Sequence, residues 1–180
     1  MADLEELYRE IILDHYRSPR NRGELNTPPA HRIEGFNPLC GDEIVVFLLV
    51  EDGKVADLKI GGSGCSISQS SASLMSAAVK GKPVGEVRRL ISTFKGMMSI
   101  HEASLEHEGH DGHQGLGTLG AAGVDGAEVV EGEPEEVDLA KLGELAALQG
   151  VVKFPVRIKC ATLSWNTLAQ GLDEVEAEAS

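Results

Sequence analysis

The sequence predicts an α+β protein in which a small antiparallel sheet of about three strands carries helices packed on one face. Three observations predict this class. The first 18 residues follow an amphipathic helical pattern, residues 33–60 hold β-branched and aliphatic runs separated by short polar turns, and the ordered pattern after residue 66 is helical. Helices that flank a hairpin cover one face of its sheet in this class of fold.

The first helix is expected over residues 3–18. Asp3 and Glu6 have the spacing of a capping box, in which each side chain bonds the other residue's backbone N–H. The apolar stripe of this helix consists of Leu4, Leu7, Tyr8, Ile11, Ile12 and His15. Pro19 ends the helix, and the polar run up to residue 32 is expected to be a loop.

The sheet is expected to begin with a short strand at residues 33–36. Residues 43–50 are nearly all β-branched or aliphatic, which is typical of a strand with at least one covered face. Glu-Asp-Gly-Lys at 51–54 is a hairpin signal, and residues 55–60 return as the partner strand. The stretch 37–42, Asn-Pro-Leu-Cys-Gly-Asp, indicates a tight turn just before the second strand.

Helical patterns dominate the rest of the chain. The glycine-rich run 61–64 leads to Cys65, and Pro83 and Pro155 stand at the starts of later helices, a position that proline favours. The expected helices cover residues 66–80, 84–98, 139–148 and 156–172, and the last of them carries Cys160.

The length of 180 residues predicts a single domain over 1–180. Ten of the 29 acidic residues and eight of the 21 glycines lie in residues 104–138, which contain no Lys or Arg, and the tail 173–180 holds four more acids. The rest of the chain is near neutral, with 15 acidic against 16 basic residues. We therefore expect a flexible acidic insertion at 104–138 and an acidic tail at 173–180.

The composition excludes several functions. The acidic balance argues against a nucleic-acid partner, which requires a basic face. No apolar run approaches the roughly 20 residues that span a bilayer, so no membrane partner is expected. The acidic amphipathic start does not resemble a signal peptide, and a cytoplasmic protein is the expectation.

The candidate site residues are Cys40, Asp42, Cys65 and Cys160. Three thiolates and one carboxylate suit tetrahedral zinc, and widely spaced cysteines in a reducing compartment indicate a metal or catalysis before disulfides. Cys65 is expected at a helix N-terminus, where the helix dipole favours a thiolate. The alternatives are that the cysteines are small buried hydrophobes and that Asp42 only shapes its turn.

Three blocks of this sequence resemble those of the IscU/NifU-N family of iron–sulfur cluster assembly proteins, and most of all its SufU branch. The blocks are Asn-Pro-Leu-Cys-Gly-Asp at 37–42, Gly-Ser-Gly-Cys-Ser-Ile-Ser-Gln-Ser-Ser-Ala-Ser at 62–73, and Lys-Phe-Pro-Val-Arg-Ile-Lys-Cys-Ala-Thr-Leu-Ser-Trp at 153–165. They occur in the family's order, and the similarity covers nearly the whole chain outside 104–138 and the tail. The resemblance implies a SufE/IscU-like fold.

The resemblance also implies a function and a role for each candidate residue. Cys40, Asp42, Cys65 and Cys160 would hold zinc, and Cys40 would be the catalytic thiol that accepts persulfide sulfur. The donor would be a PLP-dependent cysteine desulfurase of the SufS type, and a SufBCD-type assembly complex would receive the sulfur. If catalytic, the protein would be a sulfurtransferase.

Two alternatives follow from the same residues. One is a scaffold on which a transient [2Fe–2S] cluster is assembled, and the other is a non-catalytic zinc protein that regulates the desulfurase. Scaffold members of the family carry a histidine directly before the last cysteine, whereas this chain has Lys159, which favours sulfur transfer. His107, His110 and His113 within the insertion are either an auxiliary metal-loading site or part of a solvated loop, and the loop is favoured.

Overall fold

The computed structural model describes residues 3–106 and 139–179. Its elements, in chain order, are α1 (Leu4–Arg17), β1 (His31–Asn37), β2 (Asp42–Glu51), β3 (Lys54–Ser63), α2 (Ser66–Val79), α3 (Val84–Glu106), α4 (Leu139–Leu142), the 3₁₀ helix η1 (Gly143–Lys153) and α5 (Pro155–Ala179). The predicted insertion lies outside the described residues from 107 onward, and so do His107, His110 and His113. Residues 104–106 continue α3.

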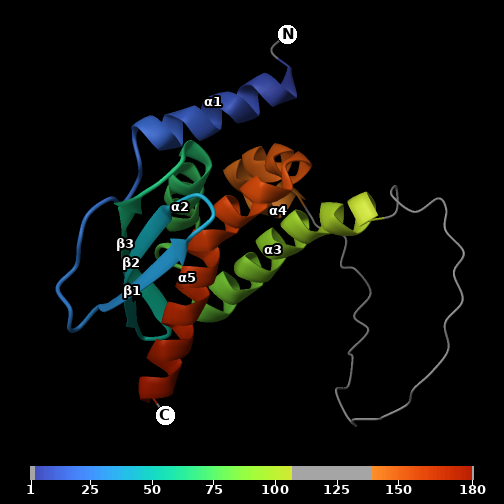
Figure 1. Ribbon diagram of the computed structural model, residues 1–180. Coiled ribbons are helices and arrows are strands. Elements are labelled where there is room, and N and C mark those ends of the chain that lie inside the picture. Colours follow the sequence, from blue (N-terminus) through green and yellow to red (C-terminus); the bar gives the residue numbers. More distant parts are fainter. Residues whose placement is uncertain (1–2, 107–138, 180) are drawn as a thin grey trace, which may run out of the picture.

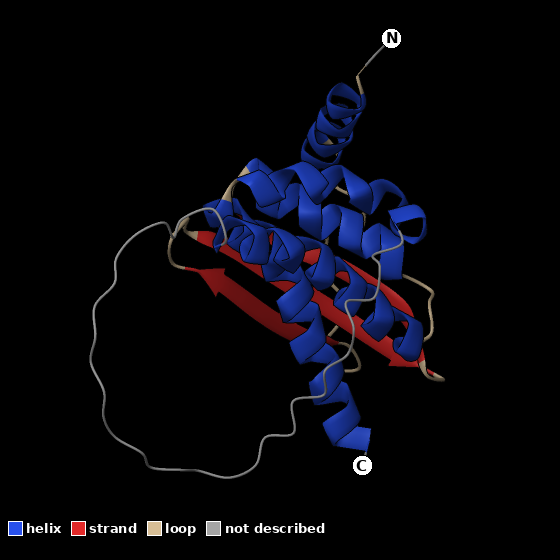
Figure 2. Ribbon diagram, turned by 90° about the vertical axis from the view of Figure 1, so that its right-hand side faces the viewer, coloured by secondary structure: helices blue, strands red, loops and turns tan. Residues whose placement is uncertain are grey.

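The strands form one antiparallel sheet in the order β1-β2-β3. The helices pack on one of its faces (Figures 1 and 2), which confirms the predicted fold class. Ile44, Val46 and Leu48 alternate along β2 toward the helices and are buried. Val45 lies on the other face, which the described helices leave uncovered.

The core is mostly aliphatic, as the low aromatic content requires. One ring pair is an exception, because Trp165 of α5 stacks on Phe94 of α3 with ring centroids 4.3 Å apart. Both rings are fully buried. The stacked pair thus packs α5 against α3. No helix in the described part of the chain is long and apolar enough to cross a membrane.

The N-terminal helix differs from the prediction in two ways. Asp3 occupies the cap position, but its side chain makes no cap hydrogen bond; its backbone carbonyl accepts from the N–H groups of Glu6 and Leu7 instead. The predicted capping box was therefore wrong. The Asp3 carboxylate is exposed, so water can supply its hydrogen bonds in place of the helix N–H groups. Leu4 and Leu7 are 58% and 47% exposed because this end of α1 projects from the body (Figure 2).

The C-terminal elements also differ from the predicted boundaries. The helix expected at 139–148 is one α turn followed by η1, and Gly143, with φ +55°, stands where the two meet. Helix α3 continues past residue 98 to Glu106, and α5 continues past residue 172 to Ala179. The acidic residues of the predicted tail are thus helical, and Asp173 and Glu176 form ion pairs with Arg88 of α3.

Helix α5 lies close to the sheet because two glycines leave room for it. A Cβ on Gly35 of β1 would overlap Thr167 Oγ1, and one on Gly171 of α5 would stand 2.6 Å from the Ile33 side chain. Thr167 and Ile33 are themselves buried. This close approach brings the N-terminal turns of α5 to the end of β1, where the candidate site lies.

We predict that Gly35→Ala destabilises the fold by about 1–3 kcal/mol, the usual cost of overpacking a filled core. Urea unfolding followed by circular dichroism measures this difference. The control is Gly85→Ala near the start of α3, where an added Cβ meets nothing within 4 Å and alanine favours the helix. Equal stability of the two variants would contradict the packing argument.

A second prediction concerns His15, which is 2% exposed on α1. Its Nδ1 lies 2.7 Å from Ser73 Oγ and its Nε2 lies 3.4 Å from Glu144 Oε2. Burial and the nearby Arg20 lower the His15 pKa from its usual 6.5, against the smaller opposing effects of Glu144 and Asp14. The folded state therefore favours neutral His15.

Because the unfolded chain binds this proton more readily, stability is lost as the pH falls below about 6.5. We expect the unfolding free energy of the wild type to decrease more between pH 7.5 and pH 5.5 than that of His15→Gln. Urea titrations at the two pH values measure both differences. A larger decrease in the variant would overturn the prediction.

Candidate metal centre

The turn between β1 and β2 carries Cys40. Asn37 and Asp42 face each other as the last pair of the β1–β2 ladder, and the Gly41 N–H donates to the Asn37 carbonyl at 2.9 Å. Gly41 has φ +68°, a conformation that favours glycine. The predicted tight turn is confirmed, and Cys40 lies on it, partly exposed.

Asp42 is fully buried at the start of β2, and two features hold its carboxylate. Its Oδ1 accepts the backbone N–H of Cys65 at 2.8 Å. Gly64 leaves the space that it occupies, because a Cβ there would be 2.5 Å from the same oxygen. A buried carboxylate with a single backbone donor has further lone pairs for a cation.

Cys65 caps α2, as predicted. Its Sγ accepts the Ser68 N–H at 3.4 Å and lies 3.8 Å from Asp42 Oδ2. Cys160 is on α5, fully buried, and its Sγ is 3.2 Å from the Cys40 Sγ. These two cysteines are 120 positions apart in the sequence, and the packing of α5 on the sheet brings them together.

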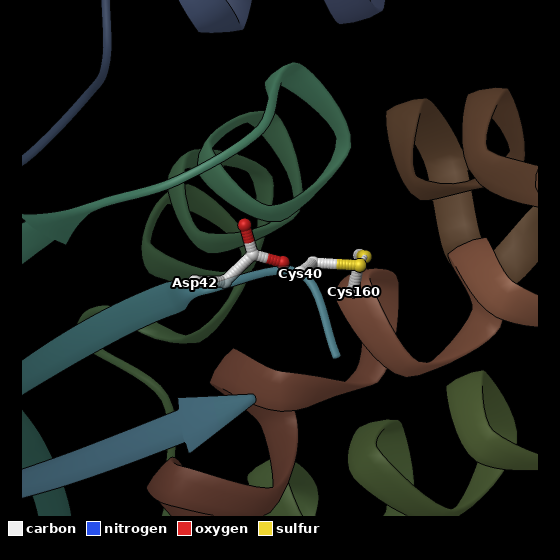
Figure 3. A group of neighbouring side chains, drawn as sticks. All are labelled: Cys40, Asp42 and Cys160. Carbon is white, nitrogen blue, oxygen red and sulfur yellow. Dashed lines mark hydrogen bonds between the residues drawn. The ribbon is translucent and has the colours of Figure 1, made fainter. Parts of the chain in front are cut away.

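Three of the four predicted residues form a mutually close group. The ligand atoms of Cys40, Asp42 and Cys160 all lie within 4.8 Å of one another (Figure 3). Two ligands of one tetrahedral zinc stand about 3.3–3.8 Å apart, as bonds of about 2.0–2.3 Å require. Cys65 is not in this group, but its backbone N–H and its Sγ both contact the Asp42 carboxylate.

The electrostatics of the cluster indicate a place for a cation. Burial raises the pKa of the Cys160 thiol well above its usual range, and hydrogen bonds with Cys40 and Asp42 raise it further. The negative charge of Cys65 and a hydrogen bond with Cys160 raise the pKa of Arg157, one turn before Cys160 on α5. Ionised sulfurs and the carboxylate of Asp42 would repel one another, and a divalent ion would offset this repulsion.

Sequence reasoning missed one buried polar residue at this site. Asn37 is 6% exposed; its Oδ1 accepts the Leu39 N–H at 3.2 Å and its Nδ2 lies 3.8 Å from Cys160 Sγ. An asparagine directly before Pro38 is a recognised turn initiator, which is the signal that could have drawn attention to it. Its contact with Cys160 is long-range, and no local pattern indicates it.

Comparison with known proteins gives consistent relatives. The family model described as the NifU-like N-terminal domain matches residues 7–110. The zinc-dependent sulfurtransferase SufU of Bacillus subtilis is 38% identical over 97% of this chain and 95% of its own. The iron–sulfur cluster assembly scaffold protein IscU of Thermotoga maritima is 34% identical over 94% of each chain.

A solved structure supports the same relationship. The crystal structure of a putative iron–sulfur cluster assembly scaffold protein for the SUF system, from Fervidobacterium islandicum, matches with a TM-score of 0.66 and 27% identity. The match covers 93% of this chain and 97% of that one. This chain therefore belongs to the NifU-like N-terminal domain family, which includes SufU and IscU, and is an iron–sulfur cluster assembly protein.

Proposed function

We propose that this protein is a zinc-dependent sulfur acceptor in iron–sulfur cluster assembly. Cys40, Asp42, Cys65 and Cys160 hold the zinc, and Cys40 accepts the sulfur. One observation carries the proposal: a partly exposed cysteine on a turn has its sulfur 3.2 Å from a buried cysteine, in a group that includes a buried carboxylate. Such a thiol can both bind a metal and meet a partner.

The residues fit zinc by their chemistry and by their packing. Three sulfur donors with one carboxylate suit this ion, and Gly64 provides the space in which Asp42 lies. Zinc, when bound, keeps the cysteine sulfurs deprotonated at neutral pH. Cys65 reaches this group by a side-chain adjustment, since its Sγ already lies 3.8 Å from Asp42 Oδ2.

The proposed transfer is thiol exchange at Cys40. Its thiolate attacks the terminal sulfur of a persulfide on the partner's cysteine, so that a new S–S bond forms on Cys40. The S–S bond of the partner breaks, and the partner's cysteine leaves as a thiolate. No oxidant or reductant is consumed. Cys65 and Cys160 remain in place on their helices and keep the site assembled.

The partner that supplies this sulfur is a PLP-dependent cysteine desulfurase of the SufS type, and a SufBCD-type complex in the cytoplasm receives it. The Bacillus subtilis relative, named a zinc-dependent sulfurtransferase, supports this assignment. Leu39 and Phe36, on and beside the Cys40 turn, are 66% and 60% exposed. Exposed apolar groups beside a reactive thiol are suited to a docking surface.

Assembly of a [2Fe–2S] cluster on the same residues is the second candidate function. Relatives named as IscU scaffold proteins favour it, because they are 31% and 34% identical over nearly all of this chain. In that case iron and sulfide are the cargo, and the four residues hold them transiently. Lys159, which stands where scaffold members carry a histidine, is exposed and offers no imidazole ligand.

The first prediction for the site tests the placement of Asp42. Gly64→Ala puts a Cβ against its carboxylate, so we expect zinc affinity to fall by about 10- to 100-fold, as for other disrupted ligand supports. Competition with a chromophoric chelator measures the affinity. The control is Gly61→Ala, whose Cβ makes only an ordinary 3.8 Å contact with Val45. Equal affinities would remove Asp42 from the ligand set.

The second prediction tests the acceptor role. After incubation with a cysteine desulfurase and cysteine, the wild type should gain one sulfur atom on Cys40, located by mass spectrometry of unreduced peptides. Cys40→Ser should gain none, because a hydroxyl does not attack a persulfide at neutral pH. Zinc content per chain is measured on both proteins, so that loss of metal is separated from loss of the thiol.

Three other outcomes would contradict the acceptor role. Sulfur found on Cys65 or Cys160 would assign the acceptor elsewhere. Undiminished stimulation of the desulfurase by Cys40→Ser, with no persulfide on either protein, would leave only the regulatory alternative. A stable cluster formed from iron and sulfide under anaerobic conditions, and transferable to apo-ferredoxin, would support the scaffold.

A further inference from the structure

Hydrogen-bond donors are distributed unequally among the three sulfurs of the site. The Ser68 N–H donates to Cys65 Sγ at 3.4 Å, and the Asn37 side-chain amide lies 3.8 Å from Cys160 Sγ. In the described part of the chain, the hydrogen-bond donor to Cys40 Sγ is the Cys160 thiol, at 3.2 Å. Cys40 Sγ therefore receives no N–H donor from the described residues, unlike the other two sulfurs.

The orientation of the Asn37 amide follows from its other contact. The Leu39 N–H can only donate, so the group 3.2 Å from it must be the amide oxygen. The NH₂ group therefore faces Cys160. Because Asn37 is 6% exposed and ends the β1–β2 ladder opposite Asp42, its side chain has little freedom to turn away.

An N–H group that donates to a thiolate withdraws charge from the sulfur. The sulfur becomes a weaker nucleophile and a less strongly electron-donating ligand. Cys65 and Cys160 receive such donors from the protein, and the Arg157 guanidinium faces the same two sulfurs. Cys40 keeps its full electron density, so it is the strongest nucleophile of the three.

From this arrangement we infer that Asn37 is a positioning residue that directs reactivity to Cys40. Its amide oxygen holds the Cys40 turn, and its NH₂ group lowers the nucleophilicity of the Cys160 sulfur. This inference rests on the proposed function, since it concerns which sulfur reacts. The Asn37 side chain thus has two roles, holding the turn and donating to Cys160, which a purely structural residue would not combine. Only a side chain with both a donor and an acceptor can perform both.

Asn37→Ser separates the two tasks. A serine hydroxyl can still accept the Leu39 N–H in the related turn, but it is too short to reach Cys160. Asn37→Asp is the second variant, because it keeps the shape and the acceptor and replaces the donor by an oxygen that repels the sulfur. Asn166→Ser, at an exposed position on α5, is the matched control.

The first measurement uses cobalt(II) bound to each purified variant. Loss of an N–H donor lets the Cys160 thiolate give up an electron to the metal more easily. The sulfur-to-cobalt charge-transfer band should therefore move to lower energy in Asn37→Ser and further in Asn37→Asp. The Asn166→Ser band should stay at the wild-type position. Loosened packing alone does not produce this graded shift, and the measurement needs no desulfurase.

The second measurement is residue-resolved alkylation of the zinc-loaded protein by iodoacetamide. The rate at Cys160 relative to Cys40 should rise about fivefold to tenfold in both Asn37 variants, the effect of one hydrogen bond. Charge-transfer bands at the wild-type energy in both variants, or an unchanged rate ratio, would overturn the role of Asn37. Sulfur transfer could still occur at Cys40, so the two proposals fail separately.

Discussion

The close packing of α5 against β1 is the constraint on which the site depends. Gly35 and Gly171 remove the side chains that would hold the helix away from the sheet, and the ring pair of Trp165 and Phe94 secures its other side. Cys160 is carried to the end of β1 by this contact. A helix displaced by the width of one methyl group would part the two sulfurs that now stand 3.2 Å apart.

Asp42 is buried at the same end of the sheet, and its carboxylate charge must be compensated there. A carboxylate taken fully out of water needs compensation, and the Cys65 N–H supplies only part of it. Burial also raises the pKa of the neighbouring Cys160 thiol, and its hydrogen bonds with Cys40 and Asp42 and the negative charges of Cys65 and Asp42 raise that pKa further. Cys40, Asp42 and Cys160 thus form a cluster that could bind a metal ion.

Much of this could be predicted from the sequence, and the remainder has physical reasons. The strand runs, the Asp-Gly hairpin and Cys65 as a helix cap are local features, and local patterns indicated them correctly. The capping box at Asp3 and the end of α5 depend on solvent exposure and on ion pairs with Arg88, which sequence periodicity does not contain. The contact between Asn37 and Cys160 joins residues 123 positions apart, so only the fold reveals it.

The four proposed ligands differ in the backbone structure that carries them. Cys65 starts a helix, Cys160 is buried within one, and Asp42 begins a paired strand, so regular backbone hydrogen bonds hold the backbone of all three in place. Cys40 stands on a turn, is partly exposed as Cys65 is, and its sulfur receives no N–H donor from the described residues. Under the proposed role of Asn37, the sulfur on the turn is also the strongest nucleophile of the three. The proposed sulfur acceptor must give up one metal ligand to a partner while the others stay assembled, and this requires both properties in the same residue.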